Sequence, residues 1–443
     1  MSGLILAATA SGAGKTTLTL GLLAALRRAG RRVAGAKAGP DYIDPAFHAA
    51  AAGRQAINLD CWAMRPATLG RLVETIERSA DLVVCEGVMG LFDGIGPSGI
   101  GSTADLAAAT GWPVVLVLDV RGQATSAAAT LAGFARHRAD VRVAGVIFNR
   151  VGGERHARLV GEAVRTALPD MAILGAVPRD EALALPERHL GLVQAGEHAD
   201  LARFLDRAAD HVARHVDLDR VAVLARPARL AAGGSDRAVG GFPPLGQRIA
   251  VARDTAFAFA YPALLDAWHG AGAALAPFSP LADEAPDAAA DAVYLPGGYP
   301  ALHAGRLAAK RTFLDGRRGA AARGAVLFGE CGGYMTLGRG LIDADGRRHE
   351  MAGLLPVETS FAQRRLHLGY REMTLVHDAG PLGAAGTRWR GHEFHYAAIV
   401  EEGAGAPLFH ARSAEGRDLG PAGRVAGRVQ GSFLHLIDRW PDA

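Results

Sequence analysis

The segment that follows the first apolar run contains a phosphate-binding loop. Residues 3–26 read GLILAATASGAGKTTLTLGLLAAL, which predicts a strand, a loop of small residues and a helix. Residues 14–16, Gly-Lys-Thr, match the end of the P-loop pattern, although Thr9 stands where the pattern has its first glycine. In such loops backbone N–H groups and the helix N-terminus bind phosphate. The lysine reaches the terminal phosphates and the hydroxyl binds Mg²⁺.

The whole loop is therefore expected to hold a nucleotide. The expected contacts come from Ser11, Gly12, Ala13, Gly14, Lys15, Thr16 and Thr17. Switch ATPases of the chromosome-partitioning type carry an extra lysine early in this loop, whereas Ala10 occupies that place here. This difference disfavours a partner-regulated switch.

Acidic residues follow the next two candidate strands. They are Asp41 and Asp44 in KAGPDYIDP (37–45), which begins with Lys37, and Glu86 and Asp93 in CEGVMGLFDG (85–94). In an open α/β sheet, ligands bind at the carboxyl ends of the strands. Mg²⁺ prefers hard oxygen ligands, so Thr16, Asp44 and Glu86 are candidate metal ligands. The alternative, in which each acid only caps a turn or a helix, stays open.

Cys331 lies in a segment with the sequence of a nucleophile elbow. Residues 324–338, GAVLFGECGGYMTLG, predict a strand, a sharp turn and a helix, with cysteine in the pattern Gly-x-nucleophile-x-Gly. The helix N-terminus is expected to lower the pKa of the thiol. The N–H of Gly332 could stabilise an oxyanion, and a second donor could come from Gly297 or Gly298 in YLPGGYP. The alternative is a buried, inert cysteine.

A cysteine nucleophile needs a base. His435 in QGSFLHLID is the first candidate, and His392 and His395 in GHEFHY are the alternatives. Cys61 and Cys85 have no comparable setting and are expected to be structural.

These residues require two α/β domains to position them. The first half alternates candidate strands at 4–9, 32–39, 81–87, 113–119, 141–151 and 172–178 with candidate helices at 15–29, 66–79, 102–110, 123–136 and 154–167. Continuous Val/Leu/Ile runs and strand–helix alternation predict a doubly wound parallel sheet. We expect a P-loop domain over 1–220, a Gly- and Pro-rich linker over 221–247 and a second α/β domain over 248–443.

The composition excludes several classes of protein. The net charge is only +3 and we find no zinc-finger, RNP or helix-turn-helix pattern, so nucleic-acid binding is not expected. Apolar runs are too short to span a bilayer, and the N-terminus lacks a signal-peptide pattern. Three cysteines form no disulfide framework. We expect a cytoplasmic protein without a membrane partner, and a homodimer stays open.

The N-terminal motifs together resemble a known family. ATASGAGKTT, KAGPDYIDPAFH and EGVMGLFDG resemble the cobyrinic acid a,c-diamide synthase family, whose first domain is related to dethiobiotin synthetase. The resemblance implies that Asp41, Asp44, Glu86 and Asp93 hold Mg²⁺ or help to phosphorylate a substrate carboxylate. It also implies that Asn149 in IFNRV and the VPRD segment (177–180) lie near adenine, although Asn149 could equally cap a strand end.

The C-terminal motifs extend the resemblance. LPGGYP, GECGGYM and GHEFHY resemble the class I glutamine amidotransferase domain in the variant fused to such synthases, and the two resemblances cover most of the chain. Many class I domains have a glutamate two residues after the catalytic histidine, where this chain has Ile437, followed by Asp438. We therefore expect a Cys–His dyad or a histidine oriented by some other group.

Both sites together imply an ATP- and glutamine-dependent amide ligase that works through an acyl phosphate. The resemblance supplies the substrate, a corrin ring acid amidated at its a and c acetates. Hydrogenobyrinic acid is favoured over cobyrinic acid. The abundance of glycine, alanine and arginine is typical of a GC-rich genome and indicates an aerobic organism. The alternatives are a partner-regulated P-loop switch with an inactive C-terminal module and an ATP-dependent ligase for another small carboxylic acid.

A polycarboxylate ring would require cationic side chains. The candidates are Arg364, Arg365, His367, Arg371, Arg388 and Arg390. A solvated basic face is the alternative for each of them, and Glu393 and His395 could instead line a domain interface.

Overall fold

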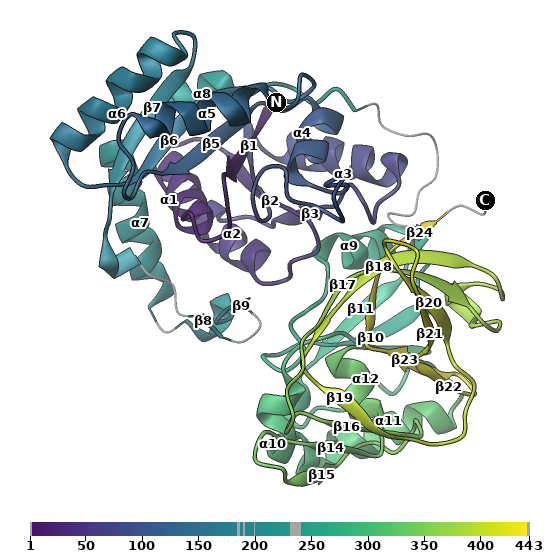
Figure 1. Ribbon diagram of the computed structural model, residues 1–443. Helices are drawn as coiled ribbons and strands as arrows, with labels where there is room; N and C mark the ends of the chain where they lie inside the picture. Colours follow the sequence, from purple (N-terminus) through teal and green to yellow (C-terminus); the bar gives the residue numbers. More distant parts are fainter. Residues whose placement is uncertain (1, 184–186, 189–190, 199, 231–240, 441–443) are drawn as a thin grey trace. The chain divides into compact units, whose positions relative to one another are not determined.

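A computed structural model describes residues 2–183, 187–188, 191–198, 200–230 and 241–440. The chain divides into two compact units, one holding residues 1–62 and 66–234 and the other residues 63–65 and 235–443. Each unit is built around a parallel sheet of its own (Figure 1).

The first unit contains a seven-stranded, wholly parallel sheet in the order β3-β2-β4-β1-β5-β6-β7. Its strands are β1 (Ser2–Ala8), β2 (Val33–Ala38), β3 (Ile57–Leu59), β4 (Leu82–Glu86), β5 (Val114–Asp119), β6 (Val143–Val151) and β7 (Ala172–Pro178). Two short strands, β8 (Glu187–Arg188) and β9 (Gly191–Leu192), pair antiparallel in a separate sheet. The predicted doubly wound sheet is confirmed.

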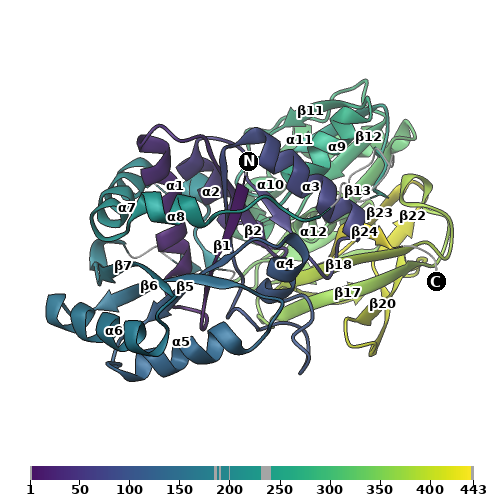
Figure 2. The same cartoon turned by 90° about the horizontal axis from the view of Figure 1, so that it is seen from above.

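The helices of this unit cover both faces of the sheet. They are α1 (Lys15–Arg28), α2 (Asp44–Ala52), α3 (Pro66–Ser79), α4 (Thr103–Thr110), α5 (Ser126–Arg136), α6 (Glu154–Ala167), α7 (Leu201–His215) and α8 (Leu218–Leu224). Figure 2 shows α1, α2 and α7 on one side of the sheet and α5 and α6 on the other. This arrangement follows from right-handed crossovers that run in opposite directions across the sheet.

The strand order reverses between β1 and β4. Helix α1 leads from β1 to β2 on one side, whereas α4 leads from β4 to β5 on the other. Ligands bind at such a switch point, outside the carboxyl ends of the strands. The P-loop follows β1, and Glu86 is the last residue of β4, so the fold brings both to this position.

The predicted linker begins later than expected. Residues 218–224 form helix α8, because the Asp217 side chain accepts a hydrogen bond from Arg220 N at 3.0 Å and Val221 is fully buried. Residues 231–240 of the predicted linker lie outside the described residues.

The second unit combines three sheets. The six-stranded sheet, in the order β11-β10-β12-β13-β23-β22, is parallel except at the β22 edge, and the other two have the orders β21-β20-β17-β18-β24 and β15-β14-β16-β19. The strands are β10 (Arg248–Ala252), β11 (Ala274–Phe278), β12 (Ala292–Leu295), β13 (Val326–Glu330), β14 (Gly340–Ile342), β15 (Arg348–Glu350), β16 (Val357–Ser360), β17 (His367–Leu375), β18 (Arg388–His395), β19 (Ala398–Glu402), β20 (Phe409–Ser413), β21 (Asp418–Ala422), β22 (Arg424–Ala426), β23 (Val429–Ser432) and β24 (Leu434–Trp440). The helices are α9 (Pro262–Gly270), α10 (Ala304–Ala308), α11 (Arg311–Ala322) and α12 (Gly332–Leu337).

An aromatic core joins the six-stranded sheet to the five-stranded one. Trp268 and Trp389 are fully buried, and Phe242 packs edge-on against both. Strand β23 pairs with β13 in the six-stranded sheet, and the chain then continues into β24 of the five-stranded sheet. The residues at the start of β24 therefore lie beside the carboxyl end of β13.

Within the described part of the chain, no helix has the length and apolar character needed to cross a membrane.

Candidate functional site

The P-loop has the backbone geometry that phosphate binding needs. Gly12 and Gly14 adopt left-handed conformations, with φ of 73° and 92°, and Gly14 immediately precedes α1. A Cβ at Gly14 would lie 2.3 Å from Asn149 Nδ2, and that amide donates to Ala13 O at 2.7 Å. The predicted residue Asn149 therefore braces the loop from the end of β6.

Lys15 points back over the loop. Its ammonium donates to Met89 O at 2.6 Å and to Ala10 O at 3.4 Å. Burial lowers the pKa of Lys15, and the nearby carboxylate of Glu86 offsets part of that effect. Backbone carbonyls thus hold the lysine where bound phosphates would compete for it.

Glu86 is the centre of the polar network at the switch point. Its side chain is fully buried, and it accepts hydrogen bonds from Thr16 Oγ1 at 2.6 Å and Lys37 Nζ at 3.0 Å. Its second oxygen lies 2.7 Å from His48 Nε2. Burial alone would raise the pKa of Glu86, but Lys37 and His48 lower it well below its usual range.

Lys37 joins Glu86 to Asp44. Its ammonium forms an ion pair with each carboxylate. Burial would lower the pKa of Lys37, whereas these two carboxylates raise it above its ordinary value. Burial and the neighbouring Asp41 raise the pKa of Asp44 to about 7, against the pull of Lys37. Two of the predicted acids therefore meet at one buried cation.

The side chains at this position suit a Mg²⁺ ion. Neighbouring ligands of an octahedral Mg²⁺ lie about 3 Å apart. Thr16 Oγ1 and Glu86 Oε1 are 2.6 Å apart, and Lys37 Nζ contacts both Glu86 and Asp44. A hydroxyl and two carboxylates form the hard oxygen set that this ion prefers.

The other two predicted acids have local partners. Asp41 accepts from the backbone N–H groups of Ile43 at 2.7 Å and Asp44 at 3.3 Å, at the start of α2. Asp93 accepts a hydrogen bond from Gly90 N at 2.8 Å, and its charge offsets a small part of the lowering of the Lys15 pKa by burial. Both acids stabilise turns, and both remain close to the loop or its lysine.

A cavity of about 840 Å³ opens beside these groups. It is lined by the loop, by Asp41, Asp44 and Asn149, and by residues 177–181 and helix α7. This volume is within the usual range of small-molecule sites. The predicted VPRD segment (177–180) thus lies on the wall of the cavity that the P-loop borders.

Two residues of this site were not predicted from the sequence. His48 follows Asp44 by one helical turn on α2, a spacing that places both on one face and could have indicated a shared role. Arg150, with φ of 58°, donates to Gly12 O at 2.8 Å and Asp119 Oδ2 at 2.6 Å. No local sequence signal marks its contact with a loop so far away along the chain.

Cys331 forms the predicted elbow. It lies between β13 and α12 with φ of 47°, a strained value for a residue with a side chain, and its N–H donates to Ser432 O at 2.8 Å. A Cβ on Gly333 would lie 1.9 Å from Leu295 O, so the turn needs glycine there.

The prediction that the helix N-terminus lowers the pKa of the Cys331 thiol is wrong. Burial raises the pKa of Cys331 to about 12, although hydrogen bonds from the N–H groups of Gly332 and Gly298 lower it in part. The side chain is only 4% exposed and borders an apolar cluster that includes Tyr334 and Phe433. Desolvation therefore outweighs the effect of the short helix.

A pH-dependent reaction rate follows from this burial. Without substrate, alkylation of Cys331 by iodoacetamide is expected to be slow at pH 7 and to rise about tenfold per pH unit up to pH 10, because only the thiolate reacts. Peptide mass spectrometry would assign the label. A rate that is already maximal at pH 7 would contradict the raised pKa.

His435 and Cys331 meet at Gly297. A Cβ on Gly297 would lie 2.5 Å from His435 Cε1 and 3.4 Å from Cys331 Cβ. The predicted base and the predicted nucleophile therefore flank the same glycine. Burial also lowers the pKa of His435 well below its usual value, which keeps the imidazole neutral.

Gly297→Ala is expected to lower turnover at this thiol about 100-fold, because the added methyl group would displace the imidazole. Gly270→Ala, at the end of α9, is the matched control because its added Cβ would meet nothing within 4 Å. Steady-state rates of the Cys331-dependent reaction in both variants test this prediction. Equal rates in Gly297→Ala and Gly270→Ala would contradict the placement of His435.

The alternative bases have other partners. His392 stacks on His435 with ring centroids 4.8 Å apart, and its Nε2 lies 3.0 Å from Tyr261 OH. Burial lowers the pKa of His392 to about 3.

Asp438, the acid that follows Ile437, contacts Arg65. Its carboxylate accepts hydrogen bonds from the backbone N of Arg65 at 2.8 Å and from Nε at 3.0 Å.

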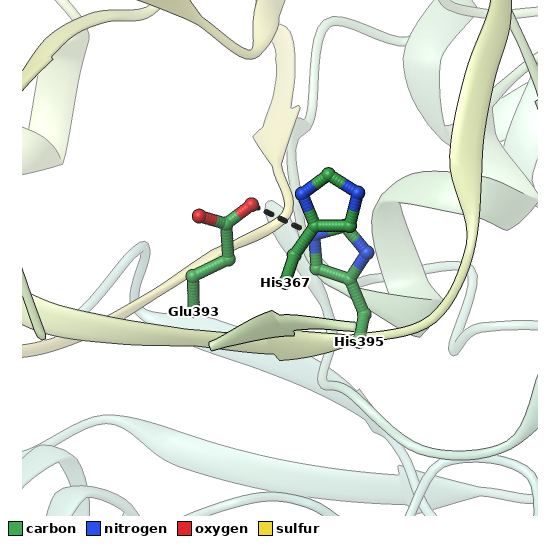
Figure 3. A group of neighbouring side chains, drawn as sticks. All are labelled: His367, Glu393 and His395. Carbon is green, nitrogen blue, oxygen red and sulfur yellow. Dashed lines mark hydrogen bonds and ion pairs between the residues drawn. The ribbon is translucent and has the colours of Figure 1, made fainter. Parts of the chain in front are cut away.

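His395 belongs to a second polar cluster, with His367 and Glu393 (Figure 3). His395 Nε2 lies 2.8 Å from Glu393 Oε1, and its Nδ1 lies 2.8 Å from Ala397 O. The other oxygen of Glu393 binds Arg371 at 2.8 and 2.9 Å. The rings of His367 and His395 are almost parallel, 6° apart, so their nitrogen lone pairs do not converge on one metal ion.

The predicted cationic face is partly neutralised. Arg371 pairs with Glu393, and Arg390 pairs with Glu372 at 2.8 Å while covering the ring of Trp440. Arg364 and Arg365 are exposed. Of the predicted cations, the two arginines before β17 are therefore the exposed ones.

Two family models match the chain. Residues 4–193 match the CobQ/CobB/MinD/ParA nucleotide binding domain, and residues 248–439 match the CobB/CobQ-like glutamine amidotransferase domain. The first match contains the P-loop and its acids, and the second contains Cys331 and His435.

Curated relatives match over nearly the full length. The chain is 55% identical over 441 residues to a protein of Rhizobium meliloti and 54% identical over 445 residues to one of Brucella anthropi, with 99% of each chain covered. A protein of Mesorhizobium japonicum is 52% identical over 438 residues, covering 98% of both chains. All three relatives are named hydrogenobyrinate a,c-diamide synthase.

Proposed function

Because this chain belongs to the hydrogenobyrinate a,c-diamide synthase family, we propose that it converts the a and c acetates of hydrogenobyrinate to carboxamides, using glutamine and ATP. The observation that carries the proposal is the presence in one chain of a P-loop site and a Cys–His pair that meets at Gly297. Each half supplies what the other lacks, an activated carboxylate or a nitrogen nucleophile.

The P-loop unit activates the carboxylate. A carboxylate is a poor electrophile, whereas an acyl phosphate has a good leaving group. We propose that the loop binds the ATP phosphates and that Lys15 moves from the Met89 carbonyl to the γ-phosphate. Asp41, on the wall of the cavity, and Asp93, whose charge acts on Lys15, would orient the substrate. Thr16, Asp44 and Glu86 would hold Mg²⁺, which neutralises developing phosphate charge when bound.

The second unit supplies ammonia. In this proposal His435 removes the proton from Cys331 as the sulfur attacks the glutamine amide carbon, and the protonated imidazole then donates to the departing ammonia. The N–H groups of Gly298 and Gly332 already point at the thiol and would stabilise the oxyanion. Water attack on the thioester releases glutamate.

A direct assay tests the function. The purified protein is incubated with MgATP, glutamine and either hydrogenobyrinate or cobyrinate, and glutamate, ADP and the ring products are measured. We expect diamide formation with both rings, faster with hydrogenobyrinate. ATP hydrolysis without glutamate release would support a P-loop switch, and amidation of neither ring would support a ligase for another acid.

A further inference from the structure

Glu330 directly precedes the nucleophile, contacts the residue after the base, and has no place in the mechanism above. It is the last residue of β13, immediately before Cys331, and its side chain is almost completely buried. A buried carboxyl group in a protein core is unfavourable unless its oxygens are hydrogen-bonded. Both of its oxygens have partners, and these partners indicate its role.

One oxygen of Glu330 holds the strand that carries His435. Oε1 accepts a hydrogen bond from Leu436 N at 2.8 Å, and Oε2 accepts one from Tyr294 OH at 2.6 Å. Tyr294 is itself fully buried in β12. The residue before the nucleophile is therefore fixed to the residue after the base, across a sequence separation of about a hundred positions.

The geometry of β24 leaves this N–H available. Gly391 pairs with Leu436 and Arg390 pairs with Asp438, so Ile437 is the extra residue of a β-bulge. Bulges interrupt the hydrogen-bond ladder and redirect nearby side chains, often beside active sites. A Cβ on Gly391 would lie 1.8 Å from His435 O, so β18 approaches the backbone of the base closely.

On this basis we propose that Glu330, held by Tyr294, is a positioning residue that fixes His435 against Cys331 through the backbone of Leu436. The inference rests on the proposed glutaminase activity. It explains how a base can be oriented although Ile437 stands where many amidotransferases have an orienting acid. Glu330 acts on the imidazole through the backbone and does not touch substrate.

Variants that separate hydrogen bonding from charge test the proposal. Glu330→Gln keeps an acceptor for Leu436 N–H and can donate to the Tyr294 oxygen, so its kcat for glutamine hydrolysis should stay within about threefold of wild type. Glu330→Met has similar length but accepts neither hydrogen bond. Its kcat should fall about 100-fold, as expected for a base displaced by roughly 1 Å, with KM for glutamine little changed.

The ammonium-dependent reaction reports on the rest of the protein. It should be unchanged in both Glu330 variants, and wild-type glutamine hydrolysis, measured in parallel, tests the proposed function separately. Tyr294→Phe removes the hydroxyl that holds Glu330 and should lower kcat several-fold. This variant tests the proposal if Glu330→Met does not fold. Wild-type kcat in Glu330→Met, or in Tyr294→Phe where Glu330→Met fails to fold, would overturn the proposal. An equal loss in Glu330→Gln and Glu330→Met would also overturn it.

Discussion

Replacing Cys331 with alanine is expected to abolish amide formation from glutamine and to preserve amide formation from high concentrations of ammonium salt. The sulfur is the only atom proposed to bond to glutamine, so glutamate release should fall on the order of 1,000-fold or more. The small alanine side chain fits the elbow without displacing Gly297 or His435.

The ammonium arm of this experiment separates catalysis from folding. ADP and amide are measured with each nitrogen source in the wild type, in Cys331→Ala and in Cys61→Ala, a control cysteine of the first unit. The control should behave as the wild type with both sources. Loss of the ammonium-dependent reaction in Cys331→Ala would show that the thiol serves folding or carboxylate activation instead.

The second large effect is expected at Glu86. Glu86→Gln should stop amide formation from glutamine and from ammonium alike, because the amide cannot neutralise Lys37 or replace a carboxylate ligand of Mg²⁺. Removing one partner of a buried ion pair also destabilises a protein by about 3–5 kcal/mol. Thermal unfolding should therefore be measured together with ADP formation.

Two further variants sharpen this prediction. Glu154→Gln removes an almost fully exposed carboxylate of α6 and should leave both reactions unchanged. Lys15→Ala removes a lysine whose hydrogen bonds go to two backbone carbonyls, so it should stop turnover with little loss of stability. Ammonium-dependent turnover at wild-type rate in Glu86→Gln or Lys15→Ala would contradict the proposed phosphate site.

The sequence predicted the fold of the first unit because that fold depends on local patterns. The strands β1, β2 and β4 are short apolar runs with polar residues at or just after their carboxyl ends, and parallel strands bring those ends together. His48 was missed because its partner Glu86 lies 38 residues away, beyond the range of helical or strand periodicity. Long-range pairs of this kind depend on strand order, which the sequence did not reveal.

At the second site, the pKa of the Cys331 thiol could not be predicted from local sequence. The rule that a helix N-terminus lowers a thiol pKa is local, whereas Cys331 is buried in a cluster that includes side chains distant in the sequence, such as Phe433 between β23 and β24. The absence of a glutamate after His435 was visible in the sequence. The bulge at Ile437 and the contact of Glu330 with Leu436 required the three-dimensional pairing of β18 and β24.

The most direct measurement follows the nitrogen atom. The protein is given glutamine labelled with ¹⁵N in its amide group, together with MgATP and hydrogenobyrinate, in the presence of a small amount of unlabelled ammonium. The proposed mechanism predicts ¹⁵N in both the a and the c carboxamides, with one glutamate and one ADP released per amide. Unlabelled carboxamides, or glutamate release with no labelled nitrogen in the ring, would contradict it.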